Sequence, residues 1–194
     1  MTLRSLAAAA ALVALGAALA LAGPPPAGAL PGASLYNLES RWTNQDGAAV
    51  PLSSLAGRPA IVAMGYTTCR DICPAIVADM VWVEKHLPPG GAARVRFAFF
   101  SFDSEADTPE RLRLYAESHG LDLGRWTLLR GDDDAVRELA AALDVPYRAN
   151  DQNGFDHAAV LSLLDARGGI VFQQRGTQAA SDELLAKLAA LLAK

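Results

Sequence analysis

The chain of 194 residues carries a formal net charge of −4 and contains only two cysteines, Cys69 and Cys73. Residues 30–194 are enough for one domain with a core that needs no disulfide to hold it together, and nothing indicates a second domain. The lysines and arginines form no basic stripe, so a nucleic-acid partner is not expected.

The N-terminus, residues 1–29, has the pattern of an export signal. Arg4 supplies a positive charge, Leu6–Ala22 is an uncharged apolar run, and small residues follow. This run of 17 residues is at the lower edge of the roughly 20 that span a bilayer, so a cleaved signal peptide and a retained membrane anchor through residues 6–22 are both open. Cleavage is favoured after Ala29. The remaining chain is expected to be extracytoplasmic, in the periplasm or on the outer face of the cytoplasmic membrane.

Strand and helix patterns alternate after this segment. Buried strands are predicted at Ala60–Gly65, Val95–Phe102 and Trp126–Leu129. Apolar spacing predicts a helix at Pro74–Leu87, and three opening aspartates predict another at Asp132–Leu143. Between them, a third helix is marked by Thr108 as N-cap, Pro109 at the first helical position and Gly120 as the stop signal.

The C-terminal part of the chain changes pattern. Two apolar runs, Ala158–Leu164 and Ile170–Gln173, are joined by the turn-forming sequence "DARGG" and predict a β-hairpin. Ser181–Leu192 predicts an amphipathic helix that begins with a capping box. The predicted fold class is α/β and thioredoxin-like, with a mixed β-sheet flanked by helices on both faces and a C-terminal β-hairpin and helix.

The two cysteines lie in "YTTCRDICPA", between the first strand and the first helix. A structural disulfide is the simplest role for them outside the cytoplasm. It would close almost the smallest loop available and stabilise little, so redox or metal chemistry is the alternative. Pro74 fits the first helical turn, which places Cys73 at or beside the N-cap, where the helix dipole favours a thiolate.

Three motifs together resemble the Sco/SenC family of thioredoxin-like copper proteins, which assist assembly of the binuclear copper centre of cytochrome c oxidase. They are "GYTTCRDICP", "FDSEADTPE" and "NGFDHAAVLSLLD", and they occur in the family's order across the mature domain. The chain departs from the family at Thr68 and Arg70, where His and Pro are frequent, and at Ser104, where Pro is usual.

The resemblance implies that residues 30–194 form a thioredoxin-like copper-binding domain, with Cys69, Cys73 and His157 as ligands of one copper ion. Two thiolates and one imidazole make a soft site of low coordination number, which suits Cu(I) and accommodates Cu(II). Zinc is the competing metal, but structural zinc sites generally take four ligands, and only three good candidates are visible.

Other polar and sulfur-containing residues have simpler roles in this interpretation. His86 and His119 lie at predicted helix ends, and Met64 and Met80 fall at core positions. Asp103 and Asp107 either orient the metal ligands without binding the metal themselves, or serve only as helix caps and strand ends.

The main functional hypothesis is a copper-binding assembly factor, a metallochaperone rather than a turnover enzyme. It would deliver copper to the copper-bearing subunit of a terminal oxidase, or reduce the cysteines of that subunit, with other copper carriers or thiol reductants as further partners. The alternative is an extracytoplasmic thiol–disulfide oxidoreductase that uses Cys69 and Cys73 and in which metal is incidental. His157 distinguishes them, because copper binding needs it and disulfide exchange does not. A peroxidase of the same fold is a third, less specific hypothesis.

Overall fold

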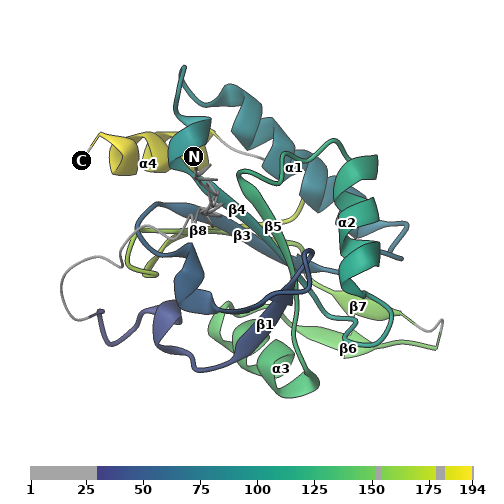
Figure 1. The fold of residues 1–194 in the computed structure, drawn as a ribbon. Helices are drawn as coiled ribbons and strands as arrows, with labels where there is room; N and C mark the ends of the chain where they lie inside the picture. Colours follow the sequence, from purple (N-terminus) through teal and green to yellow (C-terminus); the bar gives the residue numbers. More distant parts are fainter. Residues whose placement is uncertain (1–29, 152–153, 178–181, 194) are drawn as a thin grey trace, which may run out of the picture.

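The computed structural model describes residues 30–151, 154–177 and 182–193. Its centre is a seven-stranded mixed sheet with the order β2-β1-β5-β4-β3-β8-β9 (Figure 1). These strands are β1 (Arg41–Asn44), β2 (Ala49–Pro51), β3 (Ala60–Gly65), β4 (Arg96–Ser101), β5 (Trp126–Arg130), β8 (Val160–Leu164) and β9 (Ile170–Arg175). The predictions for residues 1–29 and for a cap at Ser181 lie outside the described residues.

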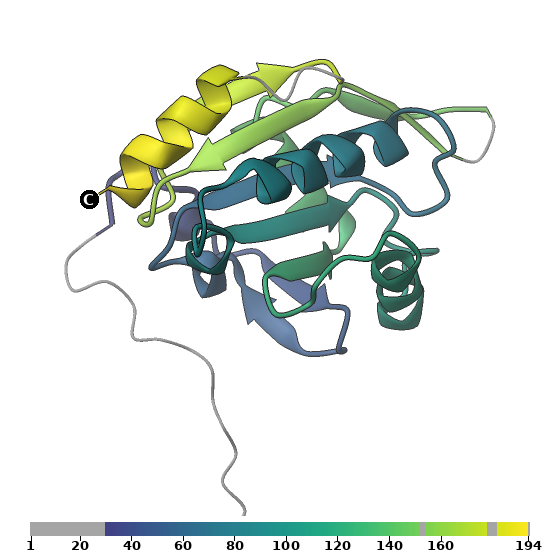
Figure 2. The ribbon, with the colours of Figure 1, turned by 90° about the horizontal axis from the view of Figure 1, so that it is seen from above.

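In the part of the chain that the structure describes, four α-helices and three short 3-10 helices surround the sheet. They are α1 (Ile72–His86), α2 (Pro109–Ser118), α3 (Asp133–Ala142), α4 (Asp182–Leu192), η1 (Leu35–Asn37), η2 (Leu52–Leu55) and η3 (Ala92–Arg94). Helices α1, α2 and α4 cover one face of the sheet, and α3 covers the other together with η1 and η2 (Figures 1 and 2). The predicted mixed sheet with helices on both faces is confirmed. No helix among the described residues has the length and hydropathy needed to cross a membrane.

The alternation of side chains along β4 explains why both faces are covered. Phe97 and Phe99 belong to the core cluster under α1, α2 and α4, whereas Ala98 and Phe100 belong to the cluster under α3. Successive side chains of a strand point to opposite faces of the sheet. A strand with apolar side chains on both faces therefore needs helices packed on each face to bury them. Strand β3, which is buried along its whole length, pairs in parallel with β4 and antiparallel with β8.

Helix α2 forms where local sequence signals predict it. The Thr108 side chain accepts a hydrogen bond from the Arg111 N–H, Pro109 occupies the first helical position, and Gly120 has a φ of 64° just after the helix. These three residues start and end the helix through local interactions alone, so α2 needs no contact with a distant segment to define its ends. The predicted hairpin of β8 and β9 is also confirmed.

Three features differ from the sequence-based expectation. Helix α1 begins at Ile72 rather than at Pro74, so Cys73 lies inside the first helical turn and Asp71 is the N-cap. Proline is tolerated there because the first N–H groups of a helix have no helical acceptor. The strand pair β1–β2 and a separate two-stranded hairpin, β6 (Tyr147–Ala149) and β7 (Phe155–His157), were not predicted, because their strands are too short to show periodicity.

We predict that Gly65→Ala destabilises the domain. A Cβ atom at Gly65 would lie 2.6 Å from Cζ of the buried Phe99 ring and 3.0 Å from the Cys73 Sγ. Overpacking of this kind costs about 1–3 kcal/mol. Urea unfolding of the reduced protein measures the change in the free energy of unfolding.

Gly32→Ala is the matched control, because a Cβ atom there meets no heavy atom within 4 Å. An unchanged free energy of unfolding for Gly65→Ala would show that β3 and α1 are not packed as closely as described.

Candidate metal centre

Two thiols and one imidazole converge at the carboxyl end of β3. Cys69 lies in the loop that follows β3, Cys73 in the first turn of α1, and His157 at the end of β7. Their potential ligand atoms all lie within 4.8 Å of one another. The Cys73 Sγ is 3.2 Å from the His157 Nε2, and both cysteines are free thiols. The three residues singled out from the sequence are therefore brought together by the fold.

The imidazole of His157 is held in the orientation that a metal ligand needs. Its Nδ1 lies 3.1 Å from the carbonyl oxygen of Ala158. A carbonyl can only accept, so Nδ1 carries the proton and Nε2 presents its lone pair toward the thiols. Burial lowers the pKa of His157, although the Ala158 carbonyl and Asp156 act to raise it. The net shift favours the neutral form of the ring, which is the form that binds metals.

The thiols have opposite electrostatic environments. Burial raises the pKa of the fully buried Cys73 thiol well above its usual value, although the Tyr66 N–H donates to its Sγ at 3.4 Å. Burial also acts to raise the pKa of Cys69, but the backbone N–H groups of residues 71–73 outweigh it and the net pKa is lowered. The expectation that the helix terminus favours a thiolate at Cys73 is wrong, because the free N–H groups of that turn point to Cys69 instead.

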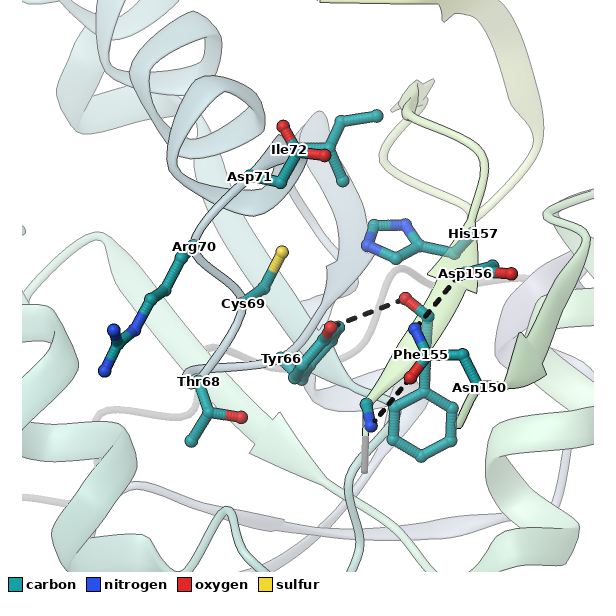
Figure 3. A pocket seen from close by; sticks show the side chains of 11 residues that line it. Tyr66, Thr68, Cys69, Arg70, Asp71, Ile72, Asn150, Phe155, Asp156 and His157 are labelled. Atoms are coloured by element: carbon teal, nitrogen blue, oxygen red, sulfur yellow. Dashed lines mark hydrogen bonds between the residues drawn. The ribbon is translucent and has the colours of Figure 1, made fainter. Parts of the chain in front are cut away.

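Cys69 and His157 line a groove with a volume of about 880 Å³, while Cys73 is buried behind it. The groove lies between the cysteine loop, residues 68–72, and the hairpin that carries residues 154–157. In Figure 3 the sulfur of Cys69 and the ring of His157 point into the same space. The half-buried Cys69 is thus the more accessible of the two thiols.

Aromatic residues that sequence reasoning missed connect the two sides of the groove. The Tyr66 hydroxyl donates to the carbonyl oxygen of Phe155 at 3.4 Å, and the two rings pack edge to face with centroids 5.4 Å apart (Figure 3). The ring of Phe102 lies 4.9 Å from that of His157. Tyr66 and Phe102 directly follow β3 and β4, and this position at the strand ends could have marked them as residues near the site. Their contacts were missed because the hairpin of β6 and β7 was not predicted.

Asp103 and Asp107 differ in what they contact. Asp103 accepts a hydrogen bond from the Ala106 N–H at 2.8 Å and caps a local turn. Asp107 is fully buried and accepts hydrogen bonds from Thr67 and Ser101 beside the cysteine loop. Burial raises the pKa of Asp107, with those hydrogen bonds acting in the opposite direction.

The remaining candidates lie outside the triad, as expected. His86 ends α1 and stacks on Trp82 with ring centroids 3.9 Å apart, and His119 caps the C-terminus of α2. Met64 and Met80 are buried in the core.

Comparisons with known proteins give a consistent result. The family model described as SCO1/SenC matches residues 31–193. A SCO1 protein homolog of Bacillus subtilis is 36% identical over 100 residues, which cover 51% of this chain and 51% of that protein. This match therefore spans about half the length of the relative.

Two solved structures are also similar. The copper-bound ScoI of Bradyrhizobium japonicum is 26% identical, with a TM-score of 0.63 over 78% of this chain and 96% of that one. BsSco, described as a member of the Sco family of cytochrome c oxidase assembly proteins with a disulfide switch, is 25% identical, with a TM-score of 0.68 over 78% and 90% of the two chains. The match over residues 31–193 and the shared thioredoxin-like architecture show that this chain belongs to the SCO1/SenC family.

Proposed function

We propose that this protein is a copper-binding assembly factor that holds one copper ion through Cys69, Cys73 and His157. The observation that carries the proposal is the convergence of two sulfur atoms and an imidazole nitrogen within 4.8 Å. Soft thiolate ligands with one imidazole suit Cu(I) and accommodate Cu(II), whereas hard cations require oxygen ligands. The hydrogen bond at the His157 Nδ1 fits a metal-binding role, since ligating histidines almost always donate their other ring N–H.

The proposed recipient of the copper is the copper-bearing subunit of a terminal oxidase. The relative BsSco is described as a cytochrome c oxidase assembly protein, and the ScoI structure from Bradyrhizobium japonicum contains copper. In this chain the groove gives an incoming sulfur ligand access beside the half-buried Cys69. Three protein ligands leave room for that sulfur, so copper can pass by exchange of one thiolate at a time.

A second candidate function, thiol–disulfide exchange, is favoured by the contrast between the two cysteines. Cys69 is the more exposed thiol and has the lowered pKa. Its thiolate attacks a disulfide of the partner and releases one partner thiolate. The Cys73 thiol then gives up its proton to that thiolate and attacks the Cys69 sulfur of the mixed disulfide, which releases the second partner thiolate. The partner gains two electrons and this protein ends with a Cys69–Cys73 disulfide. Reduction of the oxidase cysteines and delivery of copper are compatible, because copper loading requires reduced thiols.

We predict that the reduced wild-type protein retains one copper ion per chain after anaerobic titration with Cu(I) and desalting, measured by metal and protein analysis. His157→Ala and Cys73→Ser each remove a ligand, and either change is expected to abolish retention or to weaken it at least about tenfold. His86→Ala is the matched control, because that imidazole is exposed and stacks on Trp82 away from the triad.

Retention of copper by His157→Ala at the wild-type level, combined with rapid disulfide exchange, would favour the oxidoreductase over the copper-binding factor.

The affinity for Cu(I) is predicted to rise with pH. The pKa of Cys73 is raised by burial, so its thiol carries a proton at neutral pH in the metal-free protein. Ligation as a thiolate releases that proton, and the apparent affinity should increase about tenfold per pH unit for each proton released. Competition with a Cu(I) chelator of known protonation, between about pH 6 and pH 8, measures this slope. A flat profile would mean that Cys73 binds without losing a proton and would contradict its assigned role.

The proposed location is extracytoplasmic, supported by the charge and apolar pattern of residues 1–29. Fusion of residues 1–194 to a phosphatase that is active only after export should give activity in a bacterial host, and a fusion that lacks residues 1–29 should give none. Equal activity of the two fusions would contradict export by this segment.

A further inference from the structure

Asp107 is a completely buried carboxylate whose hydrogen bonds go to Ser101, the last residue of β4, and to Thr67, two residues after the end of β3. Its Oδ2 accepts from the Thr67 N–H at 3.0 Å and from the Ser101 hydroxyl at 2.5 Å, and its Oδ1 accepts from the Thr67 hydroxyl at 2.5 Å. Among the described residues, no lysine or arginine forms an ion pair with it. Burial of this carboxylate costs free energy, because it loses its hydration without gaining an opposite charge, and its three hydrogen bonds to Thr67 and Ser101 offset that cost.

The contact with Thr67 reaches Cys69 through one peptide group. The peptide that joins Tyr66 to Thr67 is planar, so the direction of the Thr67 N–H fixes the direction of the Tyr66 carbonyl. That carbonyl accepts the Cys69 N–H at 3.4 Å. By holding the N–H side of this peptide, Asp107 therefore also orients the backbone that carries the Cys69 thiol.

The contact with Ser101 reaches the histidine side of the centre. Ser101 ends β4 and pairs in register with Gly65 at the end of β3. The next residue, Phe102, donates its N–H to the Gly65 carbonyl at 2.7 Å and packs its ring against His157. One carboxylate thus connects the strand end that leads to the cysteines with the strand end that supports the imidazole.

We propose that Asp107 is a positioning residue of the metal centre, which sets the backbone of Cys69 relative to His157 through Thr67 and Ser101. This inference rests on the proposed function for its copper readout, but its structural content is independent of copper. Side chains that orient metal ligands typically change metal affinity by about 10–100-fold when they are removed.

The test compares three variants with the wild-type protein. Asp107→Ala removes every acceptor and is expected to weaken Cu(I) binding about 10–100-fold in a competition assay. Asp107→Asn keeps one carbonyl oxygen for the Thr67 N–H, so its affinity should stay close to the wild-type value. Thr67→Val removes only the hydroxyl and should give a smaller loss in the same direction as Asp107→Ala.

A second readout uses the reduced, copper-free protein. Amide hydrogen exchange of Thr67 and Cys69 should accelerate about tenfold or more in Asp107→Ala, because both N–H groups lose the arrangement that protects them. Amides in the centre of β4 should be much less affected. Asp132→Ala is the control for general destabilisation, since it removes a side-chain bond to the Ala135 N–H at the N-cap of α3. That control should lower the unfolding free energy without altering copper affinity or the exchange of these two amides.

Each outcome decides the proposal. Selective acceleration at Thr67 and Cys69 supports it even if the wild-type protein binds no copper, in which case only the proposed function fails. Unchanged exchange in Asp107→Ala overturns it. An Asp107→Asn variant as impaired as Asp107→Ala also overturns it, because charge rather than hydrogen-bonded position would then be responsible. If Asp107→Ala does not fold, Thr67→Val replaces it in both measurements. Faster amide exchange at Thr67 and Cys69 with weaker Cu(I) binding then supports the proposal, and unchanged exchange overturns it.

Discussion

The parallel, in-register pairing of β3 with β4 is the constraint on which the candidate centre depends. Gly65 and Ser101 are partners at the ends of these strands, and the segments that follow them leave the sheet at the same edge. The cysteine loop, Phe102 and Asp107 therefore meet without any long excursion of the chain. Parallel strands place their carboxyl ends together, and in open α/β sheets ligand sites commonly form at that edge. Burial of both strands on both faces fixes this register, since a slip of one residue would move apolar side chains between the two core layers.

The first turn of α1 makes the two cysteines chemically different. Its free N–H groups point to the loop residue, Cys69, and lower its pKa, whereas Cys73 lies beneath the turn in the core and its pKa is raised. Cys69 is consequently partly exposed and has the lowered pKa, whereas Cys73 is buried. This asymmetry suits stepwise exchange of ligands and also stepwise exchange of disulfides, so the same geometry accommodates both proposed activities.

The imidazole reaches the centre from a separate small hairpin rather than from the main sheet. Tyr147 pairs with His157 across β6 and β7, and the Tyr147 ring stacks on Phe102 with centroids 4.7 Å apart. Tyr66 contacts the same hairpin through its hydroxyl and its ring. Because the hairpin packs on residues that directly follow β3 and β4, the position of His157 depends on aromatic contacts that extend the core beyond the sheet.

The sequence by itself determined the elements whose signals are local. Thr108, Pro109 and Gly120 define α2, and the apolar run of β3 identifies a buried strand, because caps and continuous burial need only neighbouring residues. The motif resemblance also named all three residues of the candidate centre. Tertiary structure alone decided how they are used. Strands β6 and β7 have no periodicity of their own, the N–H groups of α1 turned out to serve Cys69 rather than Cys73, and the link from Asp107 to the cysteine loop joins residues 40 positions apart. Such contacts are set by packing between distant segments, which no short stretch of the sequence encodes.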